Sequence, residues 1–203
     1  MKIPSKNDCF QRMCAMHMLE NIVAHSLQVC RIATCLVDHL KLEGIHLDRQ
    51  LVRAAALLHD ITKTRSFKTE ENHALTGGQY LTDSGYPEVG DLVRQHVRLD
   101  DYSEDKSLAE VEIINYADKR VRHDRIVPLE ERMQYIMERY GSRPEHRQRI
   151  QLIWEKTRGL EKQIFSNLSF SPNDLNGHLP ALDISSEISG YQKLCSQLSS
   201  GSI

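Results

Sequence analysis

The amino-acid sequence predicts an all-α fold, and three observations lead to that class. Apolar residues recur at helical spacing along most of the 203-residue chain. No segment alternates apolar and polar residues as a half-buried strand does. With 10 glycines, 6 prolines and 40% hydrophobic residues, the composition is that of an ordinary globular protein. A chain of this length can bury a core large enough to fold without a disulfide or a metal.

Seven helices follow from this periodicity. Asp48 and Ser107 suit N-caps, Pro87 suits a first turn, and the glycine pair at 77–78 weakens the third helix. The expected bounds, in chain order, are 19–42, 49–61, 71–82, 87–97, 108–122, 128–141 and 144–165.

The composition changes after the seventh helix. Residues 167–203 hold nine serines, one Lys or Arg and three Asp or Glu, and glycines and prolines punctuate them. We therefore expect a helical domain over 1–166 and a Ser-rich C-terminal extension over 167–203. That extension is either loosely packed or a terminal helix, over about 184–198, docked on the domain.

Charge and apolar patterning exclude several classes of protein. Lys and Arg number 26 against 28 Asp and Glu, so the net charge of −2 argues against nucleic-acid or membrane partners. No apolar run approaches the ~18 residues of a membrane span, and no signal-peptide core is present, which predicts a cytoplasmic protein. Five cysteines without a Cys-x-x-Cys pair argue against a disulfide framework or a zinc ribbon.

Polar residues on otherwise apolar helix faces are the candidate functional residues. They are His25, the dipeptide His59-Asp60, His96 and Asp118. Each histidine alone is explained by a hydrogen bond to a carbonyl in the core. Together, two acids and several imidazoles are what a metal cluster requires, because the cation compensates the buried carboxylates.

Two other histidine positions are less informative. His73 follows acidic residues, and its pattern is ambiguous: it is either a candidate functional residue or a surface histidine at the start of a helix. The second His-Asp dipeptide, at 123–124, lies among basic residues and predicts a solvated helix end.

The order of these residues resembles a known family. The strings at 55–63 (AALLHDITK) and 114–119 (INYADK), within the order His25, His59-Asp60, His73, His96 and Asp118, are similar to the core motifs of the HD-domain superfamily. Members are metal-dependent phosphohydrolases on an all-α fold, so the resemblance implies an HD-type helical bundle. The resemblance spans about residues 19–125 and the helices that follow.

Carried over by position, the resemblance implies a dinuclear metal site. His25, His59, Asp60 and Asp118 would hold one metal, and Asp60 would bridge to a second metal held with His73 and His96. Imidazole-rich shells suit transition metals, so we expect iron or manganese, with Co, Ni and Zn also compatible.

The resemblance also assigns roles to cations. Asp60 and Lys63 are the expected catalytic residues, because the lysine of the HD-x-x-K pattern meets phosphate in similar proteins. Lys63, Arg98, Lys119 and Arg122 are the candidate substrate-binding residues. A solvated, ion-paired helix face is the alternative for these cations.

The leading hypothesis is a metal-dependent phosphohydrolase that cleaves a nucleotide or other small phosphate ester with a two-metal-activated water. Its partner would be a small phosphorylated substrate, and a homodimer is compatible with the sequence. The alternatives are a mixed-valent di-iron oxygenase of the same superfamily and a regulatory module without turnover.

Differences between this sequence and the motifs of related enzyme groups narrow the range of expected substrates. The acidic pair that follows the dyad in bifunctional guanosine-tetraphosphate enzymes is absent, and Gly85-Tyr86-Pro87 precedes His96 rather than following it as in cyclic-di-GMP phosphodiesterases. In size and ligand order the chain is similar to small bacterial HD hydrolases such as the symmetrical diadenosine tetraphosphate hydrolases. The stretch after Asp118 departs from their pattern.

Overall fold

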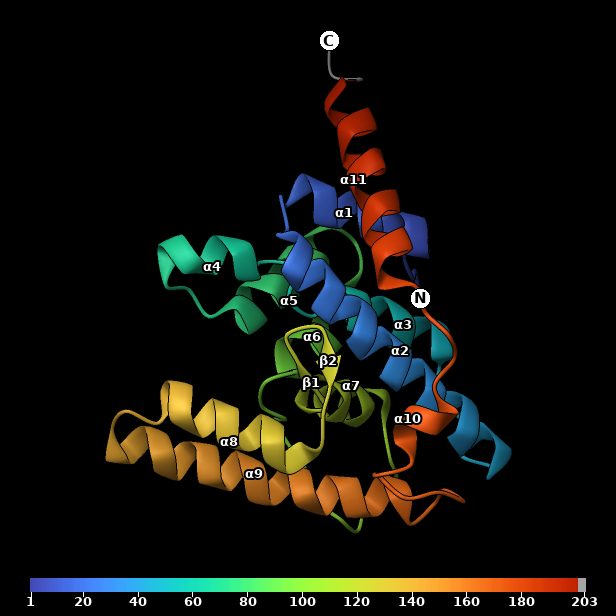
Figure 1. Ribbon diagram of the computed structural model, residues 1–203, viewed down its shortest axis with the longest axis vertical. Helices are drawn as coiled ribbons and strands as arrows, with labels where there is room; N and C mark the ends of the chain where they lie inside the picture. The colour runs from blue at the N-terminus through green and yellow to red at the C-terminus, as the bar shows by residue number, and fades with distance from the viewer. Residues whose placement is uncertain (201–203) are drawn as a thin grey trace.

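The computed structural model describes residues 1–200 and confirms the all-α prediction (Figure 1). Its only strands are two residues each and form an antiparallel ribbon. In chain order the elements are α1 (Lys6–Ala15), α2 (Glu20–Leu42), α3 (Arg49–Leu58), α4 (Lys63–Thr69), α5 (His73–Asp83), α6 (Pro87–Gln95), α7 (Glu110–Lys119), β1 (Val121–Arg122), β2 (Arg125–Ile126), α8 (Leu129–Tyr140), α9 (Pro144–Phe165), α10 (Leu175–His178) and α11 (Ile184–Ser200).

Two expected helices end three residues earlier than the sequence predicted. The helix expected over 49–61 stops at Leu58, and a separate short helix, α4, begins at Lys63. The helix expected to reach 122 stops at Lys119, because Val121 pairs with Ile126 in the ribbon. His123 lies in the turn of this ribbon with φ of +58°, so the dipeptide 123–124 is a hairpin turn and not a helix end.

Local signals explain where most helices begin. The Asp48 carboxylate accepts hydrogen bonds from the backbone N–H groups of Gln50 and Leu51, as an N-cap does. Pro87 occupies the first turn of α6, where its missing N–H has no consequence. Helix α1 has no comparable periodic signal in the sequence; it is capped by the Ser5 side chain and packs on α3 and α11.

Helix α2 forms the centre of the core. It contacts α3, α7, α11 and both strands, and its buried side chains run from Ile22 to Leu40. Helices α5 and α6 form another close pair, where a Cβ added at Gly78 would lie 2.7 Å from the carbonyl oxygen of Gly90. The glycine pair that weakens the helix by propensity is therefore what lets α5 and α6 approach each other.

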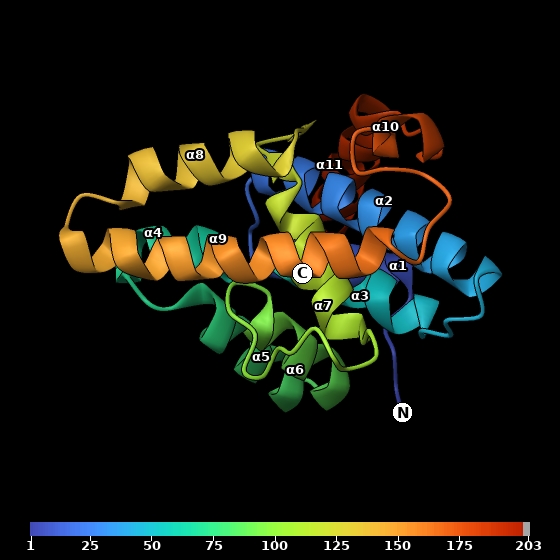
Figure 2. The same ribbon diagram turned by 90° about the horizontal axis from the view of Figure 1, so that it is seen from below.

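Helices α8 and α9 form an antiparallel hairpin that extends to one side of the bundle (Figure 2). Leu129, Met133 and Ile150 form a small core of their own between these two helices. The C-terminal half of α9 is anchored to the bundle, where the Tyr116 hydroxyl donates to Glu161 over 2.5 Å.

The C-terminal segment ends in α11, which packs on α1 and α2 (Figure 1). Tyr191 is its buried residue and donates a hydrogen bond to the carbonyl of Met18. Cys14 and Cys195 form a disulfide across this contact. The odd number of cysteines argues against a framework of several disulfides, and the structure has this single bridge. It joins residues 181 positions apart, so the spacing of the cysteines along the chain does not predict the pairing. Within residues 1–200, no helix combines the length and apolarity needed to cross a membrane.

Candidate metal centre

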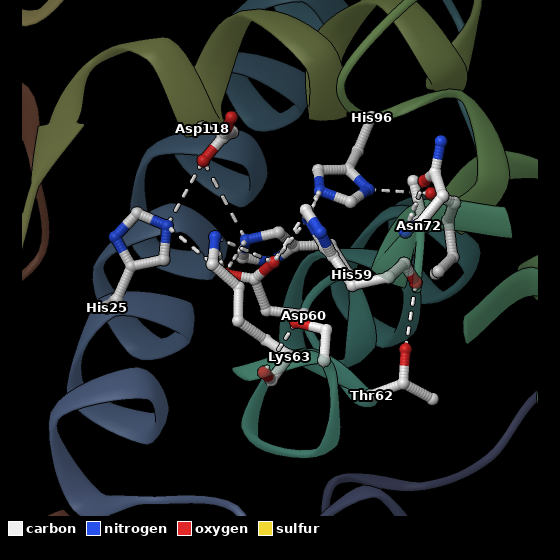
Figure 3. Close-up of polar contacts among 12 residues, drawn as sticks. His25, His59, Asp60, Thr62, Lys63, Asn72, His96 and Asp118 are labelled. Atoms are coloured by element: carbon white, nitrogen blue, oxygen red, sulfur yellow. Dashed lines mark hydrogen bonds and ion pairs between the residues drawn. The ribbon is translucent and has the colours of Figure 1, made fainter. Parts of the chain in front are cut away.

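The six predicted ligands lie together at the junction of five helices, and all of them except His73 are labelled in Figure 3. Two of the ligands lie within helices, His25 in α2 and Asp118 in α7. The others lie at helix ends: His59 and Asp60 follow α3, His73 is the first residue of α5, and His96 follows α6.

Asp60 lies at the middle of the cluster, and its two carboxylate oxygens face different ligands. Oδ1 lies 3.2 Å from His73 Nε2 and 3.6 Å from His96 Nε2. Oδ2 lies 3.4 Å from His59 Nε2 and 4.0 Å from His25 Nε2. Asp118 completes the second group, because its Oδ1 lies 3.1 Å from His25 Nε2 and 3.8 Å from His59 Nε2.

Three of the four imidazole rings are oriented by backbone carbonyls. The Nδ1 atom of His25 donates to His123 O over 2.8 Å, that of His59 to Ala56 O over 2.9 Å, and that of His96 to Val93 O over 2.7 Å. Because a carbonyl oxygen only accepts, Nδ1 carries the hydrogen in each ring. In the neutral ring, Nε2 is then the lone-pair atom, and it is turned toward the carboxylates.

This arrangement fits a metal ion better than it fits a set of hydrogen bonds. His59 Nε2 is fully buried and has no hydrogen-bond partner, and lone pairs of imidazole and carboxylate that face one another repel unless a cation lies between them. Histidines whose second nitrogen donates to a carbonyl are typical of metal ligands. Two overlapping groups, His25–His59–Asp118 and His59–Asp60–His96, have ligand atoms within 4.8 Å of one another.

The electrostatics of the cluster favour a cation. Burial alone would raise the pKa of Asp60, but the charge of Lys63 and the contact with His59 hold this pKa well below its usual range. Burial likewise opposes the ionised form of Asp118, and contacts with His25 and Lys119 hold its pKa well below the ordinary value. Two ionised carboxylates are thus buried together, which is costly without positive charge between them.

Burial also sets the state of one imidazole. It lowers the pKa of His96 to about 4, so this ring is neutral at physiological pH. A neutral ring is the form that binds a metal.

The structure adds supporting residues that the sequence did not single out. The Asn115 amide donates to the backbone carbonyl of His96 over 3.0 Å, and the Thr62 hydroxyl donates to that of His73 over 2.8 Å. Asn72 caps α5 by accepting from the N–H groups of Ala74 and Leu75. The string that contains Asn115 was recognised as a motif, but its bond to His96 joins residues 19 positions apart and has no local signature.

The predicted substrate-binding cations lie at different distances from the cluster. Lys63 is at the centre, with Nζ 3.1 Å from Asp60 Oδ2 and 3.3 Å from Oδ1. Lys119 is buried and donates to His96 O over 2.7 Å, so it supports a ligand. Arg122 is half-exposed and pairs with Glu131 over 3.3 Å, and Arg98 is exposed and lines a separate cavity.

Arg132 on α8 is a cation at this site that sequence reasoning missed. Its guanidinium lies 4.0 Å from Asp118 Oδ1, its side chain is 14% exposed, and its Nε is buried without a hydrogen-bond partner. In the sequence Arg132 follows two glutamates on a polar helix, a pattern that reads as a solvated helix face.

An all-α bundle that gathers four imidazoles and two carboxylates around a buried point has the architecture and the donor set of a helical metal-binding protein. The family model described as the HD domain matches residues 22–122, about half of the chain, and supports membership of the HD superfamily. The HD domain implies metal-dependent phosphohydrolase activity in general.

The curated relatives share segments with this chain. An uncharacterized protein of Methanocaldococcus jannaschii is 36% identical over 76 residues, which are 37% of this chain and 44% of the relative. Ribonuclease Y of Rubrobacter xylanophilus is 36% identical over 75 residues, 37% of this chain and 13% of the enzyme. A tRNA (cytidine(56)-2'-O)-methyltransferase of Picrophilus torridus is 26% identical over 157 residues, 71% of this chain and 43% of that protein. The chain thus spans less than half the length of each of these relatives, and no solved structure matches it.

Proposed function

We propose that this protein hydrolyses a small phosphate ester, with a nucleotide as the expected substrate, at a site that holds two transition metal ions. The position of Asp60 carries the proposal. One of its oxygens faces His73 and His96, while the other faces His59 and His25. A carboxylate so placed can bridge two metals, and the imidazole-rich donor set favours iron or manganese.

The metal ions, when bound, supply an acidified water and neutralise charge on the phosphoryl group. The residues of the chain do the remaining work. Asp60 and Asp118 hold the negative charge that attracts the metals. Lys63 and Arg132 add two cations beside these carboxylates, within 3.1 Å and 4.0 Å of them, where a phosphate oxygen needs charge compensation.

The substrate class is a further part of the proposal. The net charge of −2 disfavours a long polyanion, whereas the name of one relative, Ribonuclease Y, points to RNA as what that enzyme acts on. We favour a small ester and include RNA as a competing outcome of the test. A cytoplasmic location and a homodimer stay predictions.

The test combines metal analysis with a substrate panel. Protein purified without oxygen should carry close to two equivalents of iron or manganese per chain. It should release phosphate or a nucleotide from members of a panel of mononucleotides, dinucleoside polyphosphates and p-nitrophenyl phosphate. Asp60→Asn should lose both the metal and the activity, whereas Asp38→Asn, at an exposed carboxylate that pairs with Arg49, should lose neither.

Three results would contradict the proposal. They are cleavage of an RNA oligonucleotide with no turnover of small esters, oxygen consumption by the iron-loaded protein without metal-dependent phosphate release, and an Asp60→Asn variant that retains both metals.

A further inference from the structure

A cavity of about 450 Å³ lies between α9 and the segment that follows α6. It is separate from the metal cluster but shares Asn115 with it, because this residue lines the cavity and also donates to the carbonyl of His96. The volume is within the range of pockets that hold small organic ligands.

One side of the cavity is apolar. Val97 and Leu152 line it and are 38% and 54% exposed, although both are large hydrophobic residues. Leu99 and Leu160 lie deeper and are buried. Exposed apolar side chains that gather in a concave site favour an apolar group of a ligand.

The other part of the lining is positively charged. Arg98, Arg149 and Lys156 line the cavity with one acidic residue, Glu145. Within residues 1–200, the side chains of Arg149 and Lys156 form no ion pair and no hydrogen bond. Arg149, Leu152 and Lys156 follow one another at spacings of three and four residues, so the cations and the apolar surface share one face of α9.

The walls are held in place on both sides. The Gln163 amide of α9 donates to the carbonyl of Lys106 over 2.6 Å, which fixes the segment after α6 against the helix. Tyr116 of α7 and Glu161 of α9 are joined over 2.5 Å. A cavity with fixed walls loses little conformational entropy when a ligand enters.

We infer that this cavity binds a small organic anion, with its apolar part against Val97 and Leu152 and its phosphate or carboxylate beside Arg149 and Lys156. Three cations against one acid favour an anion over a neutral ligand. The inference does not depend on the proposed hydrolysis, since it rests on residues outside the metal cluster.

The first measurement uses 1-anilinonaphthalene-8-sulfonate, an anion with an apolar two-ring body, on the metal-loaded protein. Trp154 lies on α9 two residues from Leu152 and is the only tryptophan in the sequence. Excitation of Trp154 should therefore produce emission from the bound probe at one site per chain. Trp154→Phe should abolish this energy transfer while direct excitation of the probe still reports binding.

Matched variants separate the cavity from the rest of the surface. Lys156→Glu should weaken probe binding by about tenfold or more, because it replaces attraction by repulsion, whereas Lys162→Glu, at an exposed lysine further along α9, should not. Leu152→Asp should also abolish binding, and Phe67→Asp, at a 63% exposed residue of α4, should leave it intact. Circular dichroism and metal content, unchanged in all variants, would show that the fold is retained.

Displacement of the probe identifies the ligand class. Adenosine monophosphate carries a phosphate on a nucleoside, and octyl phosphate carries one on an alkyl chain. Displacement of the probe by one of them supports the inference and shows which kind of organic group the cavity accepts. Inorganic phosphate or adenosine alone should displace the probe poorly. Any of three results would overturn the inference that the cavity binds an organic anion. They are an equal loss of probe binding in the Lys156 and Lys162 variants, no displacement by either ester, and conversion of a dimer to a monomer by Leu152→Asp.

Discussion

Asp60 and Lys63 form the residue pair to which the proposed function gives two tasks, holding the metals and meeting an anionic substrate. The Lys63 ammonium lies close to both oxygens of Asp60, at 3.1 Å and 3.3 Å. Burial disfavours the charged lysine, but the attraction of Asp60 and Asp118 outweighs it and raises the pKa of Lys63. A lysine that stays charged beside the ligand carboxylates is available to a phosphate oxygen.

Lys63→Ala should therefore retain its metals and lose about 10²-fold or more in turnover of a phosphate ester, the size of effect for removing one transition-state donor. Lys63→Arg should restore activity only in part, because a planar guanidinium replaces a compact charge. Inorganic phosphate should also inhibit the Lys63→Ala variant less well than the parent.

Steady-state kinetics and metal analysis check this prediction, with Lys68→Ala, at an exposed lysine of the same helix, as the control. A Lys63→Ala variant with full turnover would assign the lysine to charge balance at the metal site alone.

The two faces of Asp60 lead to a second prediction at the residue scale. His73 and His96 approach Oδ1 only, within 3.2 Å and 3.6 Å. Substituting both with alanine should halve the bound metal and leave the site of His25, His59 and Asp118 occupied. Elemental analysis of the purified variant measures the ratio, and His146→Ala, at an exposed histidine of α9, should keep two equivalents. One metal per chain in the parent protein would contradict a dinuclear site.

At the scale of elements, the site is built where helices end. His59 follows α3 and His96 follows α6, and each ring donates Nδ1–H to the carbonyl three residues before it. Carbonyls in the last turn of a helix have no partner within the helix. The ring thus adds a donor to a carbonyl at the helix end, and the same hydrogen bond aims Nε2 at Asp60. Val93 O also accepts the backbone N–H of His96. The β1–β2 turn does the equivalent for His25, because it presents His123 O to that ring.

The α5–α6 contact is the second element-scale requirement, since these helices carry His73 and His96. A Cβ at Gly78 would lie 2.7 Å from Gly90 O and 2.8 Å from Arg94 Cβ, so Gly78→Ala must push the helices apart. Overpacking of this kind costs about 1–3 kcal/mol. Urea unfolding should show this loss of stability.

Gly190→Ala provides the control for the α5–α6 contact. It lies in α11 with open space around its Cβ position and should stabilise the protein by up to about 1 kcal/mol through helix propensity. A Gly78→Ala variant as stable as the parent would show that the two helices do not depend on their close approach.

For the whole molecule, periodicity and motif order were sufficient for the fold class, and the helix expected over 144–165 has the bounds of α9. The features that sequence reasoning missed depend on contacts between distant residues. Arg132 reaches Asp118 from 14 positions away, Asn115 holds a carbonyl 19 positions away, and the Cys14–Cys195 bridge spans 181. Nothing in local spacing reports such pairs. Helix α4 was missed for a different reason: its seven residues include none that is buried, so it has no apolar period to detect.

The same whole-molecule view predicts how metal should affect stability. Five helices converge on the cluster, and the unfolded chain cannot present the six ligands together, so metal binding favours the folded state. At a free metal concentration 100-fold above its dissociation constant, the gain is about 2.7 kcal/mol. For a chain of 203 residues this should raise the midpoint of thermal unfolding by about 5–10 °C.

Differential scanning calorimetry of the metal-loaded protein before and after treatment with a chelator measures the shift. Asp60→Asn should remove most of this metal-dependent shift, because the Asp60 carboxylate contacts both groups of imidazoles. An unfolding midpoint that does not change with metal in the parent protein would mean that the cluster does not bind metal in the folded state.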